Sequence, residues 1–293
     1  MSLTSFLANK DVKERFRQEF QMPALSIKSE LLAQPLSSRY SLVGTAFDYL
    51  MRFYLKKLNP DAVTSKWVAE QSISHPLSPL LNDVVLDSDT GKIISYTETE
   101  LTKKAAQILE QAKADYSAYL TSGQVTDRLI ETTLRLAQLD PLLRRGVVDQ
   151  NLGNVYKEDV DDLRNLITIV EPGLFKAKRL CLLNPTFGEA SRLVGGADAD
   201  LLIDQALIDI KTTKKLELRR DHFYQVIGCF VLHEIAGIGD LTPKPEISMV
   251  AIYFSRYAYL YTIDLQSIIH RESFTDFVNW FIDRAKQEHA VRL

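Results

Sequence analysis

Residues 193–215 read LVGGADADLLIDQALIDIKTTKK, and this stretch decides the fold of the second half of the chain. Two short apolar runs, 199–203 and 207–211, are separated by residues 204–206. This pattern is typical of a β-hairpin, even though the turn contains no glycine. Charge inside a strand is costly unless it binds something. The acidic residues of this hairpin are therefore candidates for a functional site.

The charged residues of the two strands fall on defined faces, because successive side chains point to opposite sides of a strand. Asp198 and Asp200 share one face of the first strand. Asp209 and Lys211 share a face of the second strand, and Ile210 points away from them. Each strand thus carries a pair of charged side chains on a single face.

The length of the turn decides which aspartates meet. A two-residue turn at 204–205 would place Asp200 directly opposite Asp209, with side chains about 5 Å apart. Two carboxylates at this separation repel each other unless a divalent cation lies between them. This register favours Asp200 over Asp198 as the ligand, whereas a different turn length would reverse the choice.

The chemistry that uses such a group is phosphodiester hydrolysis. Carboxylates, a backbone carbonyl such as that of Ile210, and water are the ligands that suit Mg²⁺ or Mn²⁺. The bound ion polarises the scissile phosphate and lowers the pKa of a coordinated water. Lys211 would orient the attacking water or offset negative charge in the transition state.

The hairpin resembles the core of the PD-(D/E)XK nucleases, and in particular their RecB-like exonuclease branch. There an aspartate strand precedes a D-x-K strand, as G-A-D-A-D precedes L-I-D-I-K-T-T here. The branch has a Q-x-x-x-Y motif on the next helix, where this chain has Q-V-I-G-C, from Gln225 to Cys229. Its upstream G-x-x-(V/F)-H motif matches Gly44-Thr-Ala-Phe47-Asp48, with Asp48 at the histidine position.

This resemblance implies a restriction-endonuclease-like fold of the α/β (α+β) class, in which helices flank a mixed central sheet. It implies Mg²⁺ or Mn²⁺ as cofactor and DNA, single- or double-stranded, as substrate. Four cluster-ligating cysteines are missing, so no iron–sulfur cluster is expected. The implied catalytic residues are Asp200, Asp209, Lys211 and Gln225, and the implied metal ligands are Asp48, Asp200, Asp209 and Ile210.

Some of these residues also have simpler interpretations. Asp48 precedes Arg52 by four residues, so an exposed helical ion pair explains it equally well. Glu189 is, like Asp198, a possible additional acid, or else a loop residue that faces water. Gln225 is otherwise a polar residue on a helix. A second D-x-K sequence, at 11–13, lies in a polar helical context without a partner strand.

Only one segment of the chain, and not its net charge, indicates binding to nucleic acid. The chain has 35 Lys and Arg and 38 Asp and Glu, a net charge of -3, which offers no support for binding a polyanion. The segment 211–222, KTTKKLELRRDH, is basic, and its cations would hold a phosphate backbone, unless it is only a solvated loop. The expected nucleic-acid contacts are Lys214, Lys215, Arg219 and Arg220, beside His222. A later strand adds Arg256, Tyr257, Tyr259 and Tyr261, as base-stacking residues or ordinary strand formers.

The first half of the chain reads as helical, because apolar residues recur at three- and four-residue spacing. Surface loops are expected at 72–79 and 87–92, where Pro, Ser, Asp and Gly gather. The predicted helices are 44–55, 101–116 with a capping box of Thr97 and Glu100, and 129–143 with an interruption near Pro141 and Gly146 beyond its end.

The second half is expected to alternate strands and helices. A buried helix over 220–235, two strands within 247–264 and an amphipathic helix over 274–287 follow the hairpin. We expect a mainly helical region, 1–165, with a helical insertion, and a nuclease core, 166–293, in one integrated domain.

Composition allows one large globular domain or two small ones. No run approaches the ~18 apolar residues of a membrane span, and the N-terminus becomes charged before a signal-peptide core forms, so a cytoplasmic protein without a membrane partner is expected.

The leading hypothesis is a metal-dependent, exonuclease-like DNA nuclease. A non-catalytic module that binds nucleic acid or a partner protein is the alternative, and RNA as substrate stays open.

Overall fold

The computed structural model describes residues 2–25, 28–74, 81–86, 93–239, 241–270 and 272–290. The chain divides into two compact units, and the N-terminal segment belongs with the C-terminal half rather than with the helical region. The first unit comprises Met1–Leu31, Asp61–Ser65 and Glu171–Leu293, and the second comprises Leu32–Pro60 and Lys66–Val170.

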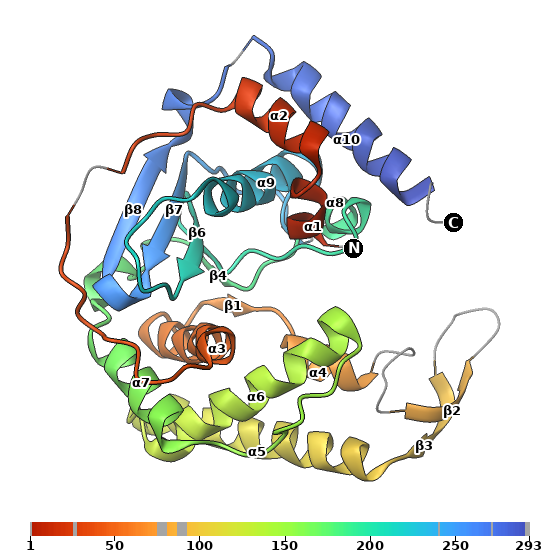
Figure 1. Ribbon diagram of the computed structural model, residues 1–293, viewed down its shortest axis with the longest axis vertical. Helices are drawn as coiled ribbons and strands as arrows, with labels where there is room; N and C mark the ends of the chain where they lie inside the picture. The colour runs from red at the N-terminus through yellow and green to blue at the C-terminus, as the bar shows by residue number, and fades with distance from the viewer. Residues whose placement is uncertain are drawn as a thin grey trace. The chain divides into compact units, whose positions relative to one another are not determined.

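A six-stranded mixed sheet forms the centre of the first unit, in the order β1-β4-β5-β6-β7-β8 (Figure 1). β1 is parallel to β4 and β6 is parallel to β7, whereas the other neighbours are antiparallel. The predicted hairpin and the two later strands are confirmed. The strands are β1 (Val63–Thr64), β4 (Cys181–Leu183), β5 (Leu201–Ile203), β6 (Ala206–Lys211), β7 (Met249–Phe254) and β8 (Tyr259–Asp264).

Helices pack against this sheet, so the expected α/β class is confirmed. α9 connects the parallel strands β6 and β7, a connection that a parallel pair requires because a tight turn cannot make it. The helices predicted over 220–235 and 274–287 are confirmed as α9 and α10. The helices of this unit are α1 (Leu3–Leu7), α2 (Lys10–Glu19), α8 (Gly188–Leu193), α9 (Arg220–Ala236) and α10 (Phe274–Ala290). Short 3-10 turns cover 172–174, 255–257 and 265–267.

An aromatic cluster holds the N-terminal helices on this unit. The fully buried ring of Phe16 on α2 lies 5.4 Å from Tyr224 of α9 and 5.2 Å from Phe277 of α10, centroid to centroid. Gly228 of α9 lets α1 approach closely, since a Cβ there would come within 3.1 Å of two α1 leucines. Burying rings of this size is strongly favourable, so α2 is held beside α9.

The second unit is mainly helical, as predicted for this part of the chain. It also contains a two-stranded antiparallel sheet that the sequence pattern did not indicate. Among the described residues of either unit, none of the helices combines the length and the apolar character needed to cross a membrane. Its elements are α3 (Tyr40–Leu58), α4 (Val68–Ser74), β2 (Leu81–Leu86), β3 (Ile93–Glu98), α5 (Glu100–Ser122), α6 (Asp127–Arg145) and α7 (Lys157–Thr168).

One predicted capping box and one predicted helix interruption are wrong. The capping box of α5 joins Thr99 to Thr102, rather than Thr97 to Glu100, because Thr97 lies within strand β3. α6 continues past Pro141, the residue expected to interrupt it, and ends at Arg145. The prediction that Gly146 lies beyond its end is confirmed, and φ of Gly146 is 65°.

The two predicted loops can be compared with the structure only in part. Residues 72–74 of the first loop are helical, as the end of α4. The remainder of both loops, 75–79 and 87–92, lies outside the described residues.

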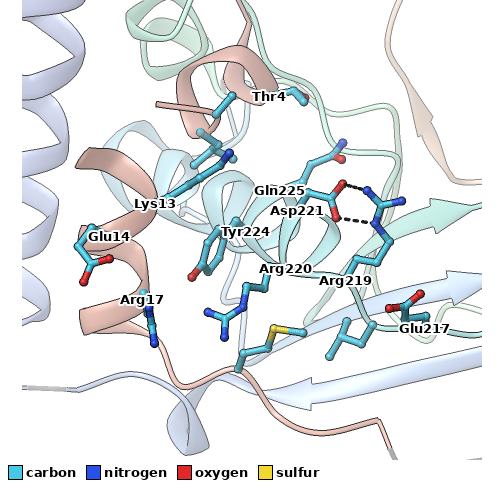
Figure 2. A pocket seen from close by; sticks show the side chains of 14 residues that line it. Thr4, Lys13, Glu14, Arg17, Glu217, Arg219, Arg220, Asp221, Tyr224 and Gln225 are labelled. Atoms are coloured by element: carbon cyan, nitrogen blue, oxygen red, sulfur yellow. Dashed lines mark hydrogen bonds and ion pairs between the residues drawn. The ribbon is translucent and has the colours of Figure 1, made fainter. Parts of the chain in front are cut away.

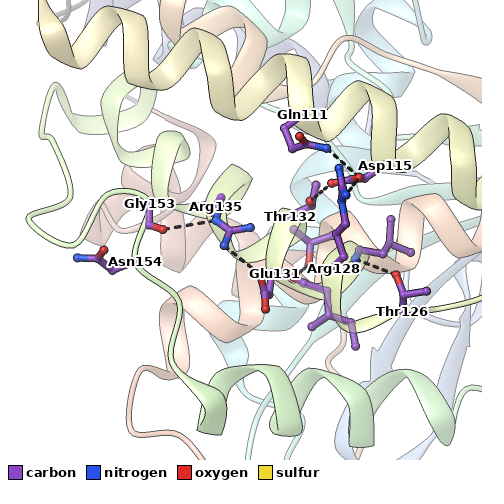
Figure 3. A network of polar contacts seen from close by, with 12 residues as sticks. Gln111, Asp115, Thr126, Arg128, Glu131, Thr132, Arg135, Gly153 and Asn154 are labelled. Atoms are coloured by element: carbon purple, nitrogen blue, oxygen red, sulfur yellow. Dashed lines mark hydrogen bonds and ion pairs between the residues drawn. The ribbon is translucent and has the colours of Figure 1, made fainter.

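Asp115 joins the two long helices of the second unit (Figure 3). Its carboxylate accepts hydrogen bonds from Arg128 Nε at 2.7 Å and Thr132 Oγ1 at 2.6 Å, both on α6. Gln111 Nε2, on α5 itself, donates to the same carboxylate at 2.9 Å. The side chain is 9% exposed, so water cannot easily replace these partners.

We expect Asp115→Ala to lower the free energy of unfolding by about 2–4 kcal/mol, because it leaves a buried hydroxyl and an amide without their acceptor. Denaturant titration followed by circular dichroism measures the change. Asp161→Ala is the control, since it removes a carboxylate from an exposed ion pair with Lys157 and should cost no more than about 1 kcal/mol. Equal losses in the two variants would contradict a structural role for the Asp115 network.

Candidate active site

The hairpin turn has the two residues that the register argument requires. Asp204 and Gln205 form the turn, and Ile203 pairs with Ala206 across it. Asp204 adopts φ 51°, a left-handed conformation that aspartate tolerates better than most residues. Its carboxylate accepts hydrogen bonds from the backbone N–H groups of residues 178–180. These bonds explain how the turn forms without glycine.

This turn brings Asp200 and Asp209 together. Leu201 pairs with Ile208, so the next position outward sets residue 200 opposite residue 209. Asp200 lies one residue before β5, and its Oδ2 accepts a hydrogen bond from the Ile210 N–H at 2.6 Å. The predicted register, with residue 200 opposite residue 209, is therefore confirmed.

Asp209, Lys211 and Gln225 form a connected group. Lys211 Nζ lies 2.7 Å from Asp209 Oδ2 and 3.0 Å from Asp209 Oδ1. It also donates to Gln225 Oε1 at 3.1 Å, so α9 takes part in holding the ammonium. Asp209 is 6% exposed, and a buried carboxylate of this kind needs the opposite charge that Lys211 supplies. The structure thus brings together the glutamine and the D-x-K strand that the sequence suggested.

Two neighbouring carboxylates alter the acidity of this site. Partial burial, followed by the charge of Asp209, raises the pKa of Asp200 to about 7. Lys211 and the Ile210 N–H act in the opposite direction, and Asp198 raises the pKa further. Near neutral pH, Asp200 therefore exchanges a proton readily.

The residues present suit a hard divalent cation. Across the described residues, no three His, Cys, Asp or Glu side chains converge as a ready metal cluster. Asp200 and Asp209 are two carboxylates, and Mg²⁺ sites commonly combine one or two of these with water and other oxygens. A cation would also favour the charged form of Asp200, whose pKa is raised by burial and by the charge of Asp209.

The additional acids lie in different surroundings. The Asp198 carbonyl accepts a hydrogen bond from Cys229 Sγ at 3.7 Å. Glu189 lies on helix α8, rather than in the expected loop, and its exposed carboxylate is 2.6 Å from Arg192. Asp48 lies on α3 of the second unit, where Arg52 Nε donates to its carbonyl at 3.0 Å. Arg52 is buried, so the expectation of an exposed ion pair at this position is wrong.

The basic segment is weaker than its sequence suggested, because several of its charges are already compensated. Asp209 neutralises Lys211, and Asp221 accepts two hydrogen bonds from Arg219, at 3.0 and 2.7 Å. Burial and the nearby Lys211 lower the pKa of His222, so its ring is mainly neutral at pH 7. The exposed cations that keep their charge available are Lys214, Lys215 and Arg220.

The later aromatic strand offers less to nucleic acid than expected. Arg256 is fully buried, and Tyr257 is buried with its hydroxyl donating to the Lys214 carbonyl at 2.6 Å. Neither side chain can stack on a base. Tyr259 and Tyr261 on β8 are partly exposed.

Sequence reasoning missed two features of this site. His222 was counted only as a cation, yet it is half-buried and close enough to Lys211 and Asp209 to feel both charges. Its position three residues before Gln225 on one helix was the available signal. Cys229, one turn beyond Gln225, is buried, and burial beside three aspartates raises the pKa of its thiol, so it stays protonated.

Comparison of this chain with protein-family models, curated proteins and solved structures gave no match.

The acidity of Asp200 predicts a pH-dependent stability. Between pH 4 and 7 the folded state keeps a proton that the unfolded state has lost, so this group's contribution falls as pH rises through that window. In chelator, Asp200→Asn should therefore become more stable relative to wild type from pH 4 to 7, by on the order of a few kcal/mol, and then level off. Denaturant titrations at several pH values measure the difference. A difference that does not change with pH would contradict the assignment.

Proposed function

We propose that this protein is a metal-dependent nuclease of the PD-(D/E)XK type, acting on DNA in an exonuclease-like manner. One observation carries the proposal. The two-residue turn places Asp200 opposite Asp209, which pairs with Lys211, and Lys211 in turn donates a hydrogen bond to Gln225. In sequence, D-x-K alone is a weak signal, since residues 11–13 repeat it. The spatial group is far more specific, because four polar residues from three chain segments meet at one place.

The fold supports the same proposal. We propose that the mixed sheet with its crossover helix α9 is restriction-endonuclease-like, the fold that the motif resemblance implies. In this interpretation β5 and β6 carry the acidic strand and the D-x-K strand, and α9 carries the glutamine. The departure at Cys229, where the family motif has tyrosine, leaves the Gln225–Lys211 contact in place.

Each residue has a defined task in this proposal. Asp200, Asp209 and the Ile210 carbonyl would hold Mg²⁺ or Mn²⁺, which supplies Lewis-acid activation of phosphate and water. Lys211 would offset charge that develops on the phosphate in the transition state. Gln225 positions Lys211, because its Oε1 accepts a hydrogen bond from the ammonium. Because Lys211 is already held in place before the reaction, its ammonium group needs no reorganisation during the reaction.

Cleavage of end-labelled single- and double-stranded DNA with Mg²⁺ or Mn²⁺ tests this proposal. We expect Asp209→Asn and Lys211→Ala each to reduce the cleavage rate by about 10²-fold or more, because each removes a charge that acts on the reacting phosphate. Labelled RNA of the same sequence, assayed in parallel, shows which nucleic acid is cut.

Two controls match these variants. Asp11→Asn changes the other D-x-K sequence, whose carboxylate pairs with Arg284 at 2.5 Å, and it should leave cleavage unchanged. Lys178→Ala removes an exposed lysine near the turn end of the hairpin and should also have no effect. Full cleavage by Lys211→Ala would overturn the site assignment. DNA binding in chelator without cleavage under either metal would replace the nuclease with a non-catalytic binding module.

A further inference from the structure

A pocket of about 900 Å³ lies beside the candidate active site, within the first unit (Figure 2). Its walls come from α1, α2, residues 217–219 and the first turns of α9. Gln225 lines this pocket and also binds Lys211, so the pocket begins where the carboxylate and lysine group ends. A molecule that occupies the pocket can therefore extend to the carboxylate and lysine group.

Three cationic side chains line this pocket without a direct ion-pair partner among the described residues. Within the described part of the chain, no hydrogen bond or ion pair is made by the side chains of Lys13, Arg17 or Arg220. Arg219 also lines the pocket, but Asp221 neutralises it through two hydrogen bonds. The remaining charges of the lining are two exposed acids, Glu14 and Glu217.

The arrangement of these cations is unfavourable without an anion. Lys13 and Arg17 are four residues apart on the exposed face of α2, a spacing at which like charges destabilise a helix. Figure 2 shows Arg17 and Arg220 reaching, from different helices, toward the same space beside Tyr224. The aromatic cluster around Phe16 fixes α2 beside α9, so the side chains of Arg17 and Arg220 stay within reach of the same pocket. A phosphate group would relieve this repulsion.

The backbone of α9 favours the same ligand. The helix has 17 residues and begins at Arg220; its N-cap residue Arg219 makes no side-chain capping bond, and Asp221 is the acidic residue of its first turn. Its first N–H groups and the positive end of the helix dipole therefore favour an anion at this end. The helix end thus adds to the attraction that the arginine and lysine side chains exert on an anion.

The spacing suits a nucleic-acid strand. Arg220 and Gln225 are five residues apart on α9, which is about 7.5 Å along the helix axis. In B-form DNA the rise is about 3.4 Å per nucleotide of one strand. The pocket therefore lies within about two nucleotides of the group that would contact the scissile phosphate.

We propose that this pocket binds a phosphate of the DNA strand next to the one that is cleaved, through Arg17, Arg220 and Lys13. The inference rests on the proposed nuclease function, which supplies the strand. Guanidinium groups suit this task, because they bind phosphate oxygens through two parallel hydrogen bonds. The pocket would fix how far a strand enters the site without reading its sequence.

Fluorescence anisotropy of a labelled single-stranded oligonucleotide, in EDTA so that no cleavage occurs, tests this proposal. Arg17→Ala/Arg220→Ala should weaken binding about tenfold or more, since two charged hydrogen-bond donors are lost. The slope of log Kd against log salt concentration should fall by about 0.7 for each phosphate contact removed. Oligonucleotides with and without a 5′-phosphate distinguish a terminal phosphate from an internal one.

Lys178→Ala/Arg179→Ala is the matched control, because it removes the same charge from exposed side chains near the hairpin turn. Its Kd should stay close to that of wild type. Arg17→Lys/Arg220→Lys should recover part of the lost affinity, and circular dichroism melts confirm that each variant folds.

The outcomes separate this proposal from the nuclease itself. Equal Kd values for the pocket variant and its control, or no binding by wild type, would overturn the pocket assignment. If wild type nevertheless cleaves DNA with Mg²⁺ or Mn²⁺, the proposed function stands without the pocket. Loss of binding in the pocket variant, together with no cleavage by wild type, would support the pocket and overturn the nuclease.

Discussion

The two-residue turn at Asp204 and Gln205 sets the relation between β5 and β6, and the candidate site depends on that relation. One residue more or less would turn the side chains of one strand to the opposite face of the sheet. The turn is held by the Asp204 carboxylate, which accepts hydrogen bonds from three successive backbone N–H groups at residues 178–180. A side chain at one end of the hairpin therefore determines which carboxylates meet at the other end.

Helix α9 adds the remaining residues of the candidate site to the two strands of the hairpin. It provides the crossover between parallel strands β6 and β7, so it must lie across the sheet next to the D-x-K strand. From this position it places Gln225 on Lys211, His222 near the same charges, and Arg220 in the adjacent pocket. It also packs against α1 and the aromatic cluster around Phe16, so the N-terminal helices become part of the same unit.

The charges of the candidate site and of the adjacent pocket differ from the net charge of the chain. Asp209 is paired with Lys211, whereas burial and then the charge of Asp209 raise the pKa of Asp200, which makes this carboxylate sensitive to a nearby cation. In the adjacent pocket the imbalance has the opposite sign, because Arg17 and Arg220 line it without forming an ion pair among the described residues, although Glu14 and Glu217 also line it. The proposed site for a divalent cation and the proposed phosphate pocket therefore lie side by side in a chain whose net charge is -3.

The sequence by itself determined the local features. Alternating apolar residues, the spacing of Asp200, Asp209 and Lys211, and the apolar run that became α9 all depend on neighbouring residues, so they could be read directly. Tertiary structure decided which charges stay available. Arg219, His222 and Arg256 looked alike as cations, yet one is paired, one has a lowered pKa and one is buried. It also decided that α2 lies against α9, because Phe16 meets Phe277 across some 260 residues of chain, a contact set by packing rather than by any local pattern.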